Sequence, residues 1–171
     1  MTSPAEVDQR RRALVVGTGL IGGSIALGLR RRGWHVSGLD VDEDRLGAAL
    51  EAGVIDVAGD DPGAEVVFVA TPAAAVAGVV RRLLNGEGRL ADAVVTDVSG
   101  VKTAIVEEAD HPRFIGGHPM AGSEQAGLHG ADPDLFEGAV WVLTPTAATD
   151  LEAFNRLKVV VMSLGDRKSV V

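Results

Sequence analysis

The chain has 171 residues, of which 46% are hydrophobic and 23% charged, and its formal net charge is -8 at pH 7. This composition is typical of a globular protein, and the length allows one domain with its own core. The negative charge argues against nucleic acid as a partner, the lack of any apolar run of about 20 residues argues against a membrane span, and the absence of cysteine excludes disulfides and thiolate chemistry.

The N-terminal segment is polar. Residues 1–12 end in three consecutive arginines, so we expect a flexible, solvated tail there. From residue 13 onward, short apolar runs alternate with helix-like segments in the order βαβα, beginning with 13–17, 20–33, 35–40 and 43–53. This alternation predicts parallel strands joined by crossover helices.

The rest of the chain continues the same alternation. Further strands are predicted at 66–70, 93–97, 114–117 and 140–144, and further helices at 73–84, 101–109 and 151–164. The strands lack polar alternation, which is typical of a sheet that is covered on both faces. We therefore predict an α/β fold over 13–171: a Rossmann-type, doubly wound, mostly parallel sheet with helices on both faces, forming one dinucleotide-binding domain.

The last predicted helix has signals at both of its ends. Thr149 and Glu152 have the spacing of a capping box, and Gly165 is suited to a left-handed C-terminal stop. Residues 118–138, by contrast, are rich in glycine and weakly periodic, and a long loop in a compact α/β domain is usually functional or mobile.

A glycine motif stands between the first predicted strand and the first predicted helix. Gly17, Gly19 and Gly22 form a G-x-G-x-x-G pattern in the context that such a motif needs. In this pattern the glycines allow a tight turn, close approach of a pyrophosphate, and close packing of helix on strand, while the free helix amides hold the phosphates. The residues that we expect to bind the nucleotide are Gly17, Thr18, Gly19, Leu20, Ile21, Gly22, Asp40, Thr71 and Pro72.

Asp40 indicates which nucleotide binds. It ends the second predicted strand, where a carboxylate can accept both hydroxyls of the adenosine ribose. A 2′-phosphate there would meet Asp40 and the acidic run 42–44, with only Arg45 to offset them, so we expect NAD rather than NADP. The alternative is that Asp40 and its neighbours merely cap the next helix, a role that suits Asp42. Thr71 and Pro72 end another strand beside this site.

Two segments carry the candidate chemistry. Residues 116–124 place His118 just beyond a predicted strand, and residues 96–102 place Asp97, Ser99 and Lys102 after another. The carboxyl ends of the strands form the edge at which open α/β sheets bind ligands. The other histidines, His35, His111 and His129, are expected to be structural or solvated.

Together with the glycine motif, the segment His118-Pro119-Met120-Ala121-Gly122 followed by Ser123 and Glu124 resembles the prephenate dehydrogenases of tyrosine biosynthesis, including members that use arogenate. The resemblance implies an NAD-dependent oxidative decarboxylation of prephenate to 4-hydroxyphenylpyruvate. It places the catalytic base at His118, with Ser99 as its polar partner and Ser123 and Glu124 lining the substrate pocket. The alternative for His118 is a structural histidine at a strand end whose ring is hydrogen-bonded to backbone groups. The alternative for Ser123 and Glu124 is that they only cap the loop.

Two departures from that family stand out. The family's turn reads D-x-G-S-V-K, whereas here the order is Ser99-Gly100, so the hydroxyl either reaches the site from one position earlier or is lost. Asp97 and Lys102 match family positions but could be only a pair at a helix start. The family also continues into a helical dimer domain, which we expect this chain to lack, leaving catalysis by the chain alone in doubt.

The expected partner is therefore a small-molecule substrate, prephenate or arogenate, and the family resemblance implies a homodimer. We expect no metal, because no histidine pair has helical ligand spacing. The N-terminus lacks the apolar core of a signal peptide, so a cytoplasmic protein is expected. Alternatives are another reductase with a similar nucleotide domain, which NADPH preference would favour, and a non-catalytic NAD-sensing module.

Overall fold

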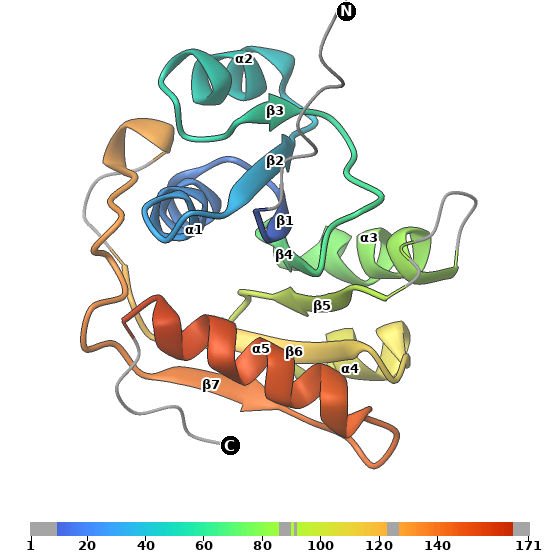
Figure 1. Cartoon of the computed structure of the whole chain (residues 1–171). Coiled ribbons are helices and arrows are strands. Elements are labelled where there is room, and N and C mark those ends of the chain that lie inside the picture. The colour runs from blue at the N-terminus through green and yellow to red at the C-terminus, as the bar shows by residue number, and fades with distance from the viewer. Residues whose placement is uncertain (1–9, 86–89, 91, 123–126, 166–171) are drawn as a thin grey trace, which may run out of the picture.

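The chain forms a seven-stranded sheet with helices on both faces (Figure 1). A computed structural model describes residues 10–85, 90, 92–122 and 127–165. The strands are β1 (Arg12–Val16), β2 (His35–Leu39), β3 (Val57–Ala58), β4 (Val66–Val69), β5 (Val94–Asp97), β6 (Phe114–Pro119) and β7 (Trp141–Thr144). The helices are α1 (Leu20–Arg30), α2 (Glu43–Glu51), α3 (Ala73–Asn85), α4 (Thr103–Ala109) and α5 (Leu151–Ser163), with one 3-10 turn, η1 (Leu128–Gly130).

The strand order is β3-β2-β1-β4-β5-β6-β7, and every neighbouring pair is parallel except β6 with β7. Strands β2 and β3 therefore lie on one side of β1, and the chain then crosses to the other side of β1 to form β4. Ligands of open α/β sheets bind at the carboxyl ends of the strands at such a reversal. The predicted Rossmann-type, doubly wound fold is confirmed.

Side chains of β1 alternate between the two layers of core. Ala13 and Val15 join the cluster that contains α1 and α5, while Leu14 and Val16 join the cluster that contains α3 and α4. Both sets are buried, as expected for a strand with helices on each side. This explains why the strand sequences are continuously apolar.

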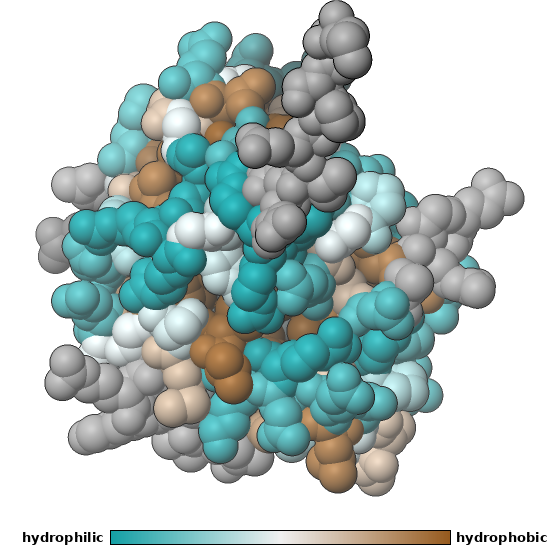
Figure 2. Space-filling model, in the orientation of Figure 1, coloured by the Kyte–Doolittle hydropathy of each residue, from teal (hydrophilic) through white to brown (hydrophobic). Residues whose placement is uncertain are grey.

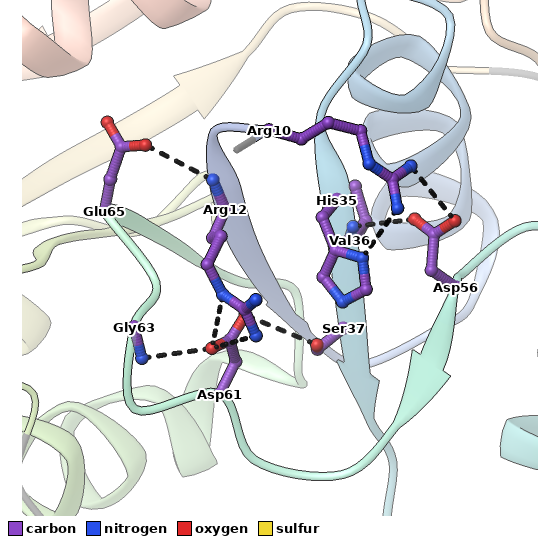
Figure 3. A network of polar contacts seen from close by, with 9 residues as sticks. All are labelled: Arg10, Arg12, His35, Val36, Ser37, Asp56, Asp61, Gly63 and Glu65. Carbon is purple, nitrogen blue, oxygen red and sulfur yellow. Dashed lines mark hydrogen bonds and ion pairs between the residues drawn. The ribbon is translucent and has the colours of Figure 1, made fainter. Parts of the chain in front are cut away.

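The arginine run is not a loose tail, and here the prediction for residues 10–12 was wrong. Arg12 is the first residue of β1, and its guanidinium donates to both oxygens of the buried Asp61 at 2.9–3.1 Å (Figure 3). Arg10 lies 3.6 Å from the carboxylate of Asp56, and Arg11 pairs with Glu65. These ion pairs with carboxylates that are distant in sequence hold the three arginines against the folded domain. Residues 1–9 of the expected tail lie outside the described part of the chain.

Three further details differ from the sequence-based expectation. The strand at 140–144 runs antiparallel to β6, and the short strand β3 was not predicted. The cap of α5 is Asp150, which accepts from the N–H of Ala153 at 2.8 Å, whereas Thr149 bonds to Thr146. A carboxylate one position closer to the helix thus displaces the predicted capping box, although Gly165 does have the positive φ (117°) expected of a helix stop.

The surface shown in Figure 2 is mostly hydrophilic, with hydrophobic side chains in small separate groups. On α5, Leu151, Val159 and Met162 are exposed. Among the described residues, no helix has the length and apolar character needed to cross a membrane.

Candidate functional site

The glycine motif forms a tight turn between β1 and α1. Gly17 has a φ of 96°, which favours glycine, and its N–H donates to the carbonyl of Leu39 at 2.7 Å. A β-carbon on Gly17 would lie 2.5 Å from the carbonyl oxygen of Ala70, and one on Gly22 would lie 1.8 Å from that of Gly17. Neither glycine can be replaced by a larger residue without moving the backbone. The start of α1 therefore packs closely against the ends of the strands.

Gly19 differs from the other two glycines. A β-carbon on Gly19 would meet no atom of the described residues within 4 Å, so these residues leave the space above it open. Gly19 is the N-cap of α1, and no side chain caps the helix there. The amides of the first turn, which include those of Leu20 and Ile21, therefore face an open space with the positive end of the helix dipole behind them. This arrangement suits an anion such as a pyrophosphate.

Asp40 follows β2 and lies beside this turn. Its Oδ2 accepts from the N–H of Thr18 at 2.8 Å and from the Thr18 hydroxyl at 3.0 Å, and its Oδ1 accepts from the N–H of Asp42 at 3.0 Å. Burial alone would raise the pKa of Asp40, but these hydrogen bonds and the nearby Arg45 outweigh it and hold the pKa below its ordinary value. Asp40 is thus a fixed carboxylate at the end of β2.

Arg45 covers the outward side of Asp40, a contact that the sequence did not reveal. Its Nη1 lies 3.2 and 3.3 Å from the two carboxylate oxygens of Asp40, while its Nη2 pairs with Asp42 at 3.2 Å. Asp42 caps α2 by accepting from the N–H of Arg45 at 3.0 Å, as its sequence position suggested. The capping alternative therefore applies to Asp42, and Asp40 remains available for another role.

Thr71 and Pro72 follow β4, immediately beside the glycine turn. A β-carbon on Gly17 would lie 3.2 Å from the N–H nitrogen of Thr71, which places this segment against the motif. The hydroxyl of Thr71 is buried and has no hydrogen-bond partner in the described part of the molecule. Buried hydroxyls are normally satisfied, so this one is free for a ligand or a water. Pro72 directly precedes α3.

His118 lies within β6, not beyond it as predicted. The strand extends to Pro119 because it pairs antiparallel with β7, where His118 stands opposite Val142. The imidazole is partly exposed and faces the turn after β5: a β-carbon on Gly100 would lie 3.5 Å from its Cε1 and 3.6 Å from its Nε2. Gly100, which the sequence did not single out as a site residue, is thus the neighbour of the ring.

A buried ion pair holds the two segments together. Asp97 is fully buried; its Oδ1 accepts from the N–H of Gly117 at 3.1 Å, and its Oδ2 accepts from the N–H of Ser99 at 2.9 Å and from Lys102 Nζ. Burial lowers the pKa of the Lys102 ammonium, and the ion pair with Asp97 only partly opposes this. One carboxylate thereby fixes the residue before His118 and the residue before Gly100.

Ser99 occupies the same turn. Its hydroxyl is buried without a hydrogen-bond partner among the described residues. The backbone N–H of Ser99 is bonded to Asp97, while Gly100 takes the position against the imidazole. The reversed order in the sequence was the signal for this difference.

The remaining predicted residues are separate from this site or outside the described part. Ser123 and Glu124 fall in the range 123–126, which the structure does not describe. His35 bonds to Arg10 at the start of β2, and the Nδ1 of His111 accepts from the N–H of Arg113. Within the described ranges, no group of three or more His, Cys, Asp or Glu residues could hold a metal ion.

Comparison with known proteins places these features in a family. The family model described as "Prephenate dehydrogenase, nucleotide-binding domain" matches residues 25–170. Prephenate dehydrogenase of Bacillus subtilis (strain 168) is 38% identical over 157 residues, which are 85% of this chain and 42% of the relative. The chain thus spans less than half the length of this relative.

Solved structures agree. The crystal structure of Synechocystis arogenate dehydrogenase has a TM-score of 0.84 and 39% sequence identity, and the match covers 91% of this chain and 58% of that one. Prephenate dehydrogenase from A. aeolicus, in complex with hydroxyphenyl propionate and NAD+, has a TM-score of 0.83 and 30% identity, covering 92% of this chain and 58% of that one.

Proposed function

The chain belongs to the prephenate dehydrogenase family, and from that premise we propose that it binds NAD and takes part in the oxidative decarboxylation of prephenate to 4-hydroxyphenylpyruvate. The observation that carries the proposal is that the open glycine turn, Asp40 and His118 all lie at the carboxyl ends of β1, β2 and β6, which belong to one sheet. The A. aeolicus relative, with its bound aromatic acid and NAD+, supports a small-molecule substrate for this domain.

The residues present fit a dinucleotide. The open space over Gly19 and the uncapped start of α1 suit the pyrophosphate, and Asp40 suits the hydroxyls of the adenosine ribose. The unpartnered hydroxyl of Thr71 lies next to the glycine turn and would find a partner in a bound nucleotide. Together with Gly17, Thr18, Leu20, Ile21, Gly22 and Pro72, these residues make up the proposed nucleotide site.

His118 is the proposed base. NAD, when bound, accepts the hydride that leaves C4 of the substrate ring. As that hydride leaves, the hydroxyl on C4 acquires ketone character and becomes acidic, so the imidazole of His118, which lies next to Gly100, can take its proton. Loss of carbon dioxide then leaves an aromatic phenolate, which recovers the proton from the imidazolium of His118 and becomes the phenol of the product. The hydrogen bond from the N–H of Gly117 to Asp97 positions the imidazole of the next residue, and Ser99, Ser123 and Glu124 are the other residues of the proposed substrate site.

Arogenate is a second candidate substrate, because the Synechocystis relative that matches at 39% identity is an arogenate dehydrogenase. The two substrates differ in the side chain, which carries a keto group in prephenate and an amino group in arogenate. The homodimer that the family resemblance implies and a cytoplasmic location belong to the same proposal.

The decisive experiment compares the chain with its His118→Asn variant. Reduction of NAD is followed by the absorbance of the reduced nicotinamide, with prephenate and with arogenate, and NAD affinity is measured by calorimetry. We expect the variant to lose roughly 10²–10⁴-fold in kcat while its Kd for NAD stays unchanged. His129→Asn, an exposed histidine on η1, is the matched control and should keep full activity.

Two outcomes would contradict parts of this proposal. Equal turnover by the chain and by His118→Asn would exclude His118 as the base. Clear NAD binding with no turnover of either substrate would leave the cofactor site standing and would favour the alternative of a module that only senses NAD.

A further inference from the structure

We propose that Arg45 reduces the preference of this site for NAD over NADP, because its guanidinium occupies the face of Asp40 that the adenosine ribose requires. This inference rests on the proposed nucleotide site. It concerns a residue that the glycine motif does not include and whose contact with Asp40 only the tertiary structure reveals.

The carboxylate of Asp40 has one direction left for a ligand. Its side chain is only 2% exposed, and the backbone N–H groups of Thr18 and Asp42 hold its two oxygens from the protein side. Arg45 Nη1 bridges both oxygens from the solvent side, at 3.2 and 3.3 Å. A ribose diol that donates to the same two oxygens needs the position that Nη1 holds.

Arg45 is able to move. Its side chain is 43% exposed, and its second nitrogen pairs with Asp42, whose side chain is 45% exposed. The pair with Asp42 is exposed and contributes little to stability, and Asp40 keeps its hydrogen bonds from Thr18 and from the N–H of Asp42 when Arg45 leaves. On NAD binding, Arg45 therefore has to leave Asp40, and this competition weakens the affinity for NAD.

The same guanidinium has the opposite effect on NADP. A 2′-phosphate next to Asp40 would face the carboxylates of Asp42, Glu43 and Asp44, which all lie at the start of α2. Arg45, displaced from Asp40 but held nearby by its own backbone position in the first turns of α2, can donate two parallel hydrogen bonds to that phosphate. The carboxylates alone would favour NAD strongly over NADP. Arg45 therefore reduces the difference between the two affinities.

The test is calorimetric titration of the full chain with NAD+ and with NADP+ at fixed ionic strength, without substrate. For Arg45→Gln we expect NAD+ to bind at least as tightly as before and NADP+ to bind about tenfold or more weakly, the loss expected for a charge-assisted contact. Arg45→Lys, which keeps the charge but not the bidentate geometry, should fall between the two. Arg82→Gln removes the same charge from the last turn of α3 and should change neither affinity.

The possible outcomes distinguish failure of the role of Arg45 from failure of the proposed nucleotide site. An equal loss of NAD+ and NADP+ affinity in Arg45→Gln would overturn the inference, since it would mean that Arg45 contacts a part common to both nucleotides. Unchanged affinities would also overturn it. If the unaltered chain binds neither nucleotide, the proposed cofactor site itself fails, and the inference fails with it.

Discussion

Gly100 lies directly against the imidazole of His118: a β-carbon added to Gly100 would stand 3.6 Å from Nε2 and 3.5 Å from Cε1. Both distances are ordinary van der Waals contacts, so the position has room for a small side chain. The prephenate dehydrogenases that this chain resembles have a serine at this place in the turn, whereas here Ser99 comes one residue earlier.

Replacing Gly100 by serine should therefore raise activity. A hydroxyl at this position would lie next to the Nε2 of His118 and could hydrogen-bond to it, and one such bond is worth about 1 kcal/mol, or roughly fivefold in kcat. The measurements are kcat with prephenate and the NMR signals of the His118 ring. Gly100→Ala adds the β-carbon without the hydroxyl, so identical behaviour of the serine and alanine variants would refute the explanation.

Removing the partner of Asp97 should destabilise the domain. In Lys102→Met the fully buried Asp97 carboxylate loses its counter-charge, and breaking a buried pair in this way costs about 3 kcal/mol or more. Urea unfolding measures the loss. The double variant Asp97→Asn with Lys102→Met removes the charge as well and should recover part of the stability. A single variant as stable as the parent would show that water reaches Asp97.

The ion pairs around Asp56 should make stability depend on pH. Burial would raise the pKa of Asp56, but the N–H of Val36 at 2.8 Å, Arg30 at 3.1 Å and Arg10 at 3.6 Å outweigh it and hold the pKa below its ordinary value. A carboxyl whose pKa is lowered by folding stabilises the protein above its unfolded pKa, and this contribution is lost as the pH falls through the folded value.

The corresponding variant is Asp56→Asn. At neutral pH we expect its free energy of unfolding to fall by about 1–3 kcal/mol, since the lost hydrogen bonds involve charged groups. The difference from the parent should shrink as the pH drops below about 4. Asp60→Asn, at an exposed site nearby, serves as the control. A deficit that persists unchanged at low pH would mean that the charge of Asp56 is not what stabilises the fold.

Two glycines of the motif should respond differently to the same substitution. Gly22→Ala would place a β-carbon 1.8 Å from the Gly17 carbonyl oxygen, so we expect a loss of about 1–3 kcal/mol or more in stability. In Gly19→Ala the new methyl group meets no atom within 4 Å in the described part of the chain, so the variant should fold with near-normal stability, yet bind NAD more weakly because the methyl group occupies the approach to α1. Thermal unfolding and calorimetry measure the two effects. Equal NAD affinity in Gly19→Ala and the parent would place the pyrophosphate elsewhere.

Much of the fold could be predicted from local patterns. The apolar strands β1, β2, β4, β5 and β6, the helices between them and the turn that joins β1 to α1 follow from hydrophobic runs, caps and glycines close together in the sequence. Asp42 could be identified as a cap for the same reason, because its partner, the N–H of Arg45, is three residues away. Where a competing residue stood next to the expected one, as Asp150 does next to Thr149, local reasoning chose the wrong cap.

Sequence by itself determined that this chain builds a nucleotide-binding α/β sheet with Asp40 directly after one strand and His118 near the carboxyl end of another, because these features depend on neighbours along the chain. Only the tertiary structure decided the antiparallel course of β7, the capture of Arg12 by Asp61, the cover of Arg45 over Asp40 and the contact between Gly100 and His118. Most of these contacts join residues far apart in sequence. The contact of Arg45 with Asp40 joins residues that are close in sequence, but several carboxylates lie within reach of this flexible side chain. Packing, and not the periodicity of the sequence, decides which of them it contacts.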